Sequence, residues 1–185
     1  FFVQTRNLTG GGTLLGQGGV LLVRQAAGAA LEGRVDAIVT APLAKVALAA
    51  AGVPYPGHTE MLADLAGSAC VAMMFVADRL RLTLATIHIP LAEVSRRLDV
   101  SSLADKILLT RDALIRRARI ADPRIALLGV NPHAGEGGMF GDEEERIVVP
   151  AREVARSRGW RVEGPFPADS FFYRRVDGFD AVIAM

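Results

Sequence analysis

Residues 124–163 read RIALLGVNPHAGEGGMFGDEEERIVVPAREVARSRGWRVE, and this stretch decides the fold. It opens with a short apolar run, 124–130, which predicts a buried strand. Residues 143–158 are amphipathic, with an acidic first turn and a basic last turn, as a helix dipole favours. Gly159 marks the end of that helix, and residues 160–163 predict another strand. A strand, a loop, a helix and a second strand in succession are typical of an α/β sheet.

The same alternation continues through the rest of the chain. Further helices are expected over residues 18–33, 43–51 and 101–119 and after Pro90, and further strands over 35–40, 70–77, 81–88 and 179–184. Ser101 or Ser102 is a candidate N-cap for the 101–119 helix. Residues 53–58 should be irregular, and the strands on either side of Asp78, Arg79 and Leu80 should pair as a hairpin. The predicted fold class is three-layer α/β/α, with helices on both faces of the sheet.

The composition is that of an ordinary globular protein. Of 185 residues 51% are hydrophobic, and 21 basic against 20 acidic side chains leave a net charge of +1, which predicts no nucleic-acid partner. No apolar segment reaches the ~20 residues of a membrane helix, and no signal peptide is visible, so we expect a cytoplasmic protein without a membrane partner. The single cysteine, Cys70, lies in an apolar run and should be a buried thiol. The chain starts at Phe1 and stops after an apolar strand, so residues 1–185 are expected to be a central portion of a longer protein, truncated at both ends.

Three histidines, His58, His88 and His133, each follow the end of an apolar element. If the strands are parallel neighbours, their carboxyl ends meet at one edge of the sheet, where α/β proteins bind ligands. Imidazole is a common metal ligand and proton carrier, and converging histidines suit zinc. The alternative is that each is a loop or capping residue, because no H-x-x-x-H or H-E-x-x-H spacing fixes two of them on one helix.

Other candidates have equally plain structural alternatives. Lys45 could bind a carboxylate or phosphate, or be a solvated residue on the first turn of a helix. Asp169 could be a functional carboxylate or an N-cap, and Glu136 is similarly open. The acidic group 142–145 is explained by the helix dipole. The glycine-rich residues 10–19 lack a G-x-G-x-x-G after a strand and a following Walker lysine, which argues against a phosphate loop.

Five short sequence motifs, taken together and in their order along the chain, resemble those of a known protein family. They are AIVTAPLAK (37–45), PGHTE (56–60), ATIHIP (85–90), NPHAGEGG (131–138) and GPFPAD (164–169). Together they resemble the 4-hydroxythreonine-4-phosphate dehydrogenase family of pyridoxal phosphate biosynthesis. The resemblance runs from about residue 18 to the last residue, and the two strings NPHAGEGG and GHTE are its most specific part.

This resemblance implies a fold similar to that of isocitrate and isopropylmalate dehydrogenases: two α/β domains with the active cleft between them. It also implies a homodimer whose active site lies at or near the subunit interface. The implied reaction is an NAD- or NADP-dependent oxidation of the secondary alcohol of 4-phosphohydroxy-L-threonine, followed by decarboxylation to 3-amino-2-oxopropyl phosphate. A divalent metal (zinc, magnesium or cobalt) would assist it.

The resemblance also assigns roles to residues. His58 and Thr59 match the substrate-contacting pair, and His88 and His133 match two metal-binding histidines. We hypothesise that His58 positions the substrate or moves a proton, that Asp169 orients a ligand histidine or a water, and that Lys45 belongs to the catalytic set.

The third metal histidine of the family lies in a Tyr-His-Asp-Gln string after a strand that matches 179–185. That string falls beyond Met185, as do most cofactor-binding residues, which are therefore unassigned here. We expect the 185 residues alone not to be catalytically competent.

Several readings stay open at the level of sequence. Relatives in the same family act on threonate or erythronate 4-phosphate, or on the cis-dihydrodiol of terephthalate, and the motifs do not separate these substrates. A different functional hypothesis is that the protein is a non-catalytic, metal-binding relative of this family. An acyl-transfer hydrolase has no support, because no G-x-S-x-G string is present.

Overall fold

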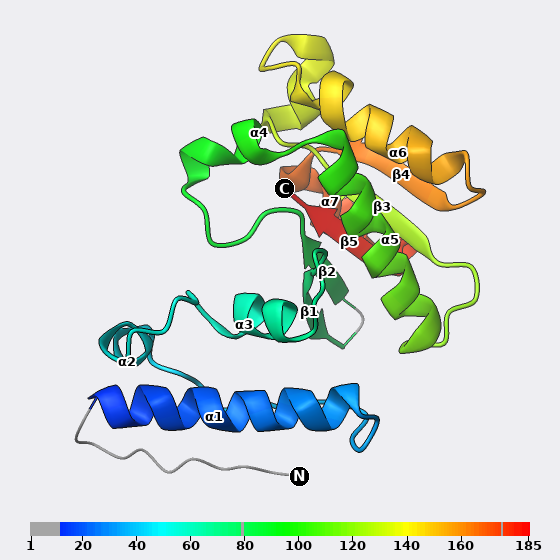
Figure 1. Ribbon diagram of the computed structural model, residues 1–185. Coiled ribbons are helices and arrows are strands. Elements are labelled where there is room, and N and C mark those ends of the chain that lie inside the picture. Colours follow the sequence, from blue (N-terminus) through cyan, green and yellow to red (C-terminus); the bar gives the residue numbers. More distant parts are fainter. Residues whose placement is uncertain (1–11, 79, 175) are drawn as a thin grey trace. The chain divides into compact units, whose positions relative to one another are not determined.

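The computed structural model describes residues 12–78, 80–174 and 176–185 (Figure 1). These residues fall into two compact units, which divide between Val71 and Ala72. Within the described ranges, no helix is long and apolar enough to cross a bilayer.

The first unit is helical and contains α1 (Gly12–Leu31), α2 (Lys45–Ala50) and α3 (His58–Leu65). The three helices meet around the buried side chains of Val23, Leu48 and Met61. Helix α1 lies so close to α2 that a Cβ on Gly16 would be 2.2 Å from the carbonyl oxygen of Ala47. In the glycine-rich stretch 10–19, Gly16 therefore allows close helix packing. Gly16 to Gly19 lie within α1, and residues 10 and 11 are outside the described part of the chain.

The prediction of a strand over residues 35–40 is wrong. Residues 37–44 have no regular secondary structure, and Val39 is 76% exposed. A strand needs a neighbouring backbone to complete its hydrogen bonds, and no strand is present in the described residues of this unit. The helices expected around 18–33 and 43–51 are confirmed, and the irregular stretch from 53 ends where α3 begins at His58.

The second unit contains a five-stranded sheet. Its strands are β1 (Met73–Ala77), β2 (Leu80–Leu84), β3 (Arg124–Leu128), β4 (Arg161–Phe166) and β5 (Ala181–Ala184). Their order is β1-β2-β5-β3-β4, with β1 and β2 antiparallel and all other neighbours parallel. The predicted hairpin is confirmed, although Arg79 lies outside the described residues. Cys70 is half-buried instead of buried, because β1 begins only at Met73 and leaves it outside the sheet.

Helices cover both faces of this sheet, as expected. The helical segments are η1 (Leu91–Glu93), α4 (Val94–Arg97), α5 (Val100–Arg116), η2 (Pro132–Gly138), η3 (Glu144–Val148), α6 (Val149–Arg156), α7 (Ala168–Arg174) and η4 (Val176–Gly178). Alternate side chains of β3 enter two cores: Ile125 and Leu127 pack with residues of α5 and α6, whereas Ala126 and Leu128 pack with Phe171 of α7. This two-sided burial confirms the three-layer α/β/α prediction.

The N-cap of α5 is Asp99, so the prediction of Ser101 or Ser102 is wrong. The Asp99 carboxylate accepts a hydrogen bond from the Ser102 backbone N–H at 2.9 Å, and the Ser102 hydroxyl accepts one from the Asp99 N–H at 3.4 Å. This reciprocal pair is a capping box. The backbone hydrogen bond from Ser102 holds the pKa of the Asp99 carboxyl below its ordinary value.

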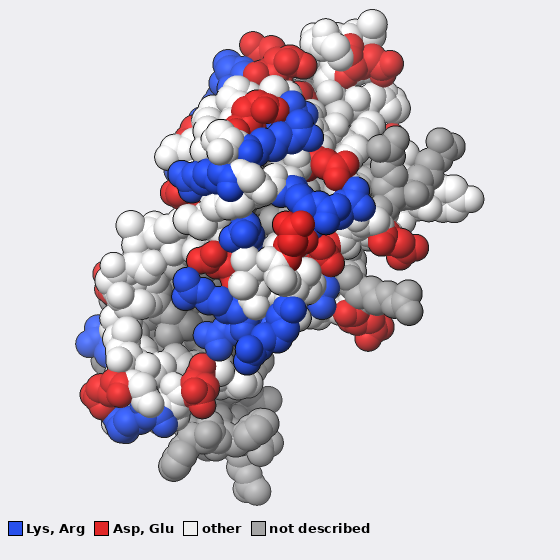
Figure 2. Space-filling model, turned by 90° about the vertical axis from the view of Figure 1, so that its right-hand side faces the viewer, with Lys and Arg blue, Asp and Glu red and all other residues white. Residues whose placement is uncertain are grey.

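Charged side chains of both signs interleave on the face shown in Figure 2. The ion pairs of the second unit include Arg124 with Glu163 at 2.8 Å and Arg161 with Asp122 at 3.3 Å. Because these pairs are partly or largely exposed, each contributes little to stability.

Candidate functional site

The strand order brings two of the predicted histidines to the same edge of the sheet. His88 lies four residues after the end of β2, and His133 lies five residues after the end of β3. Since β2, β5 and β3 are parallel neighbours, their carboxyl ends share one edge and β5 lies in the middle. The loops that bear the two histidines therefore leave the sheet on either side of β5. His88 was expected directly at the end of a strand, but β2 stops at Leu84.

The described residues do not by themselves complete a metal centre. No group of three or more His, Cys, Asp or Glu side chains among them could hold a metal ion. Two imidazoles are nevertheless suitable zinc donors, and catalytic zinc sites use three protein ligands. The family's third histidine is expected after the strand that is β5 here, between the other two. The assignment of His88 and His133 as metal ligands stays a prediction.

The loop that carries His133 has an unusual backbone. Residues 133–138 all have positive φ, between 44° and 94°, and His88 has φ 56°. A left-handed backbone costs a non-glycine residue roughly 1–2 kcal/mol, so such a run persists only where the surroundings hold it. Strain that is concentrated on both candidate ligands is typical of a functional site.

Asp169 is a charged neighbour of His133. Its carboxylate Oδ2 lies 3.5 Å from His133 Nδ1, and both side chains are more than half exposed. Asp169 lies inside the first turn of α7, so it is not the N-cap. A carboxylate beside Nδ1 favours the tautomer that protonates this nitrogen, which leaves Nε2 available as a ligand atom.

A buried carboxylate, Glu144, holds the start of the His133 loop. Its Oε1 accepts hydrogen bonds from the backbone N–H groups of Val130 and Asn131, both at 2.7 Å. Its Oε2 accepts one from Asn131 Nδ2 at 2.9 Å, and the same amide donates to Glu143 at 2.7 Å. Glu144 is only 3% exposed. The helix dipole is therefore not a sufficient explanation of the acidic group 142–145.

The role of Glu144 was missed in the sequence, although a signal was present. Glu144, Ile147, Val148 and Ala151 are all buried and follow the i, i+3, i+4, i+7 spacing of a helix face. An acid on the apolar stripe of a helix requires hydrogen-bond donors inside the protein.

Two glycines allow the loop to approach this carboxylate. A Cβ on Gly135 would lie 2.7 Å from Glu144 Oε2, and one on Gly129 would lie 2.7 Å from the Ala134 Cα. Neither distance is tolerated between non-bonded atoms. The glycines of NPHAGEGG and its flank are therefore partly explained by packing against Glu144.

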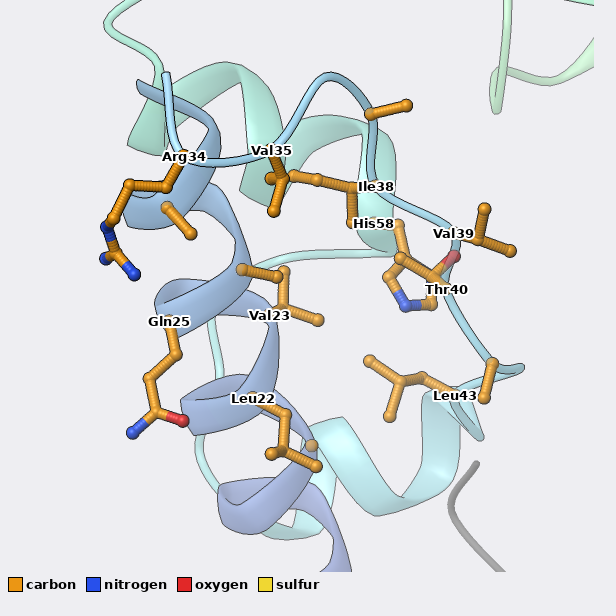
Figure 3. A pocket seen from close by; sticks show the side chains of 15 residues that line it. Leu22, Val23, Gln25, Arg34, Val35, Ile38, Val39, Thr40, Leu43 and His58 are labelled. Carbon is orange, nitrogen blue, oxygen red and sulfur yellow. The ribbon is translucent and has the colours of Figure 1, made fainter. Parts of the chain in front are cut away.

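The first unit contains a cavity of about 580 Å³ that reaches His58 (Figure 3). Its walls are mainly apolar and come from α1 and from the 34–43 segment, for example Leu22, Ile38 and Leu43. His58 Nε2 is buried and has no hydrogen-bond partner among the described residues. A buried polar atom in that state costs free energy unless a ligand or water satisfies it.

The other two predicted residues of this unit lie on helix starts. Thr59 follows His58 in the first turn of α3, and Lys45 is the exposed first residue of α2. The structure thus divides the predicted residues between the units: His58, Thr59 and Lys45 are in the first unit, and the remaining ones are in the second.

Residues 14–185 match the family model described as pyridoxal phosphate biosynthetic protein PdxA. The chain belongs to this family. Within the PdxA family it is 49% identical to the 4-hydroxythreonine-4-phosphate dehydrogenase of Desulforapulum autotrophicum, over 84% of this chain and 46% of that protein. It is 50% identical to the D-threonate 4-phosphate dehydrogenase of Cupriavidus necator, over 82% and 46%.

A solved PdxA-family structure confirms the fold. The crystal structure of 4-hydroxythreonine-4-phosphate dehydrogenase from Klebsiella pneumoniae superposes with a TM-score of 0.83 at 44% identity. The match covers 94% of this chain and 53% of that one. The chain therefore spans about half the length of the curated relatives it matches.

Proposed function

We propose that the full-length protein is an NAD- or NADP-dependent dehydrogenase that oxidises the secondary alcohol of 4-phosphohydroxy-L-threonine and releases CO2 from the product. Family membership supports the class of reaction. The observation that carries the site is the position of the two histidine loops, one on either side of the carboxyl end of β5. D-threonate 4-phosphate is the second candidate substrate, supported by the 50% identity to a dehydrogenase of that name.

His88 and His133 would hold a divalent metal (zinc, cobalt or magnesium), together with a ligand from outside the 185 residues. When bound, the metal would polarise the substrate hydroxyl while the nicotinamide takes up the hydride. The two imidazoles suit zinc or cobalt better than magnesium, which prefers oxygen ligands.

The chain's own residues have distinct tasks in this proposal. His58, whose Nε2 finds no hydrogen-bond partner within the described part of the chain, binds the substrate or moves a proton, with Thr59 beside it as a hydroxyl donor. Asp169 keeps the proton of His133 on Nδ1. Lys45 provides a positive charge for the phosphate or carboxylate of the substrate.

The assembly is also a proposal. Because the chain covers about half of its relatives, we infer that it is the central portion of a two-domain dehydrogenase. That enzyme would act in the cytoplasm as a homodimer with the active site at or near the subunit interface. Its nicotinamide-binding residues would lie mostly outside these 185 residues.

A turnover assay tests the proposal. Formation of reduced nicotinamide by the full-length protein is followed with 4-phosphohydroxy-L-threonine, D-threonate 4-phosphate, D-erythronate 4-phosphate and the terephthalate dihydrodiol. The first substrate should give the highest kcat/KM, and His88→Ala or His133→Ala should lower it by at least about 100-fold. Asp112→Asn, a change at a partly exposed position on α5 where the carboxylate pairs with Arg116, is the matched control and should have no effect. Absence of turnover with every substrate and either nucleotide would refute the dehydrogenase assignment.

A further inference from the structure

We propose that Glu144 is a positioning residue whose buried carboxylate holds the 129–138 loop in the left-handed conformation that presents His133. The inference rests on the proposed function, in which His133 is a metal ligand. Glu144 does not act on the substrate itself; it acts through the backbone of the loop.

The hydrogen bonds of Glu144 require a carboxylate. Three donors converge on its two oxygens: two backbone N–H groups on Oε1 and the Asn131 side-chain amide on Oε2. A glutamine of the same shape has only one oxygen. Whichever way its amide is turned, an NH2 group faces a donor, either the Asn131 amide or the backbone N–H groups of Val130 and Asn131.

Hydrogen bonds at several points hold the strained run in place. Ala134 N–H donates to Asn131 O at 3.1 Å, Phe140 N–H donates to Gly135 O at 3.2 Å, and Gly129 N–H donates to Phe166 O of β4 at 2.8 Å. Two residues with positive φ, His133 and Ala134, precede Gly135, and three more, 136–138, follow it. The carboxylate of Glu144 anchors the loop from outside, because it fixes the backbone N–H groups of Val130 and Asn131 just ahead of the strained run.

The hydrophobic core fixes Glu144 in turn. Glu144 begins the π-helical turn η3, whose residues Ile147 and Val148 are 2% and 0% exposed and belong to the core under α5 and α6. A π-helical turn is rare and often marks a functional site. The core therefore sets the position of the carboxylate, the carboxylate sets the start of the loop, and the loop sets His133 opposite Asp169.

Three full-length proteins test this role: wild type, Glu144→Gln and Glu145→Gln. Glu145 is exposed and lies in the same turn, so its substitution removes the same charge without touching the loop. Hydrogen exchange of the Val130 and Asn131 amides is measured without metal, and Co2+ affinity is measured by competition with a chelator.

We expect Glu144→Gln to speed exchange of both amides at least about tenfold and to weaken Co2+ binding by about 10- to 100-fold. Glu145→Gln should match wild type in both measurements. If Glu144→Gln also matches wild type, or if exchange rises while Co2+ affinity is unchanged, the positioning role is overturned.

A second pair of variants serves if Glu144→Gln does not fold. Gly135→Ala presses on the carboxylate, whereas Gly137→Ala adds a methyl group in open space, so only the first should weaken Co2+ binding; equal affinities overturn the role. If wild-type protein binds Co2+ but turns over no substrate, the proposed reaction is contradicted. The role of Glu144 is then still decided by the amide exchange and Co2+ affinity of the variants. Wild-type protein that binds no Co2+ overturns the metal site and this role with it.

Discussion

Alanine at Gly135 should destabilise the second unit far more than alanine at Gly137, two residues along the same loop. Both glycines have positive φ, 80° and 64°, so both substitutions force alanine into a left-handed conformation at about 1–2 kcal/mol. Their surroundings differ. A Cβ at Gly137 meets no atom within 4 Å, whereas a Cβ at Gly135 would lie 2.7 Å from Glu144 Oε2 and 3.3 Å from Gly141 O.

Glu144 can relieve the Gly135 contact only by moving away from its donors. Hydrogen bonds to a charged group contribute about 1.5–3 kcal/mol each, so loss of one adds that amount to the backbone strain. We expect a loss of about 1–2 kcal/mol for Gly137→Ala. For Gly135→Ala we expect about 2.5–5 kcal/mol, the sum of the strain and one lost bond.

Urea unfolding followed by the fluorescence of Trp160 measures this difference. Trp160 is the only tryptophan of the chain and packs against the core that contains Ile147 and Val148. The free energy of unfolding is obtained from the midpoint and the slope of the transition. Equal destabilisation by the two alanines would refute the view that the loop packs tightly on a fixed carboxylate.

Three further changes have outcomes that follow from single contacts. Asp99→Ala should cost about 1 kcal/mol of unfolding free energy at neutral pH, because the helix loses its cap. The folded pKa of Asp99 is lowered, so this stabilisation is present above the ordinary pKa of 3.8 and disappears as the pH falls through the folded pKa. Urea unfolding of wild type and variant should therefore converge in acid, and a constant difference would contradict this. Asp64→Asn should lower the raised pKa of Tyr55 toward 10.0 in an ultraviolet titration, because the Tyr55 hydroxyl donates a hydrogen bond to the Asp64 carboxylate. An unchanged titration curve would show that this hydrogen bond is absent in solution. Thr110→Val should cost about 1–3 kcal/mol in thermal or urea unfolding, because the buried hydroxyl of Thr83 loses its hydrogen-bond partner, the Thr110 hydroxyl at 2.9 Å. A double variant with valine at both positions should recover part of that loss. A double variant as unstable as the sum of the two single variants would argue against the pair.

Much of the second unit could be predicted because its elements are encoded by local patterns. The apolar run at 124–128 and the amphipathic 143–158 segment specify a strand and a helix from their own periodicity. The strand expected at 35–40 shows the limit of such reasoning. Its β-branched composition favours extended backbone, but a strand also needs a partner, which no local pattern reveals.

The candidate site depended more heavily on long-range arrangement. The sequence placed each histidine after an apolar element, but only the strand order shows that β5 separates the loops of His88 and His133. Glu144 escaped notice because the helix dipole already offers a local explanation for an acid near a helix start. Its donors, Val130 and Asn131, are 14 and 13 residues away, so only the folded chain reveals them.

The metal dependence of turnover is the most direct measurement of the central claim, that the loops after β2 and β3 build a metal-assisted dehydrogenase site. Full-length wild-type protein is stripped with a chelator, assayed with 4-phosphohydroxy-L-threonine and nicotinamide nucleotide, and assayed again after addition of Zn2+ or Co2+. The account predicts that stripped wild type is inactive and recovers with metal, whereas His133→Ala does not recover. Full activity of the stripped protein, or full recovery of His133→Ala, would contradict it.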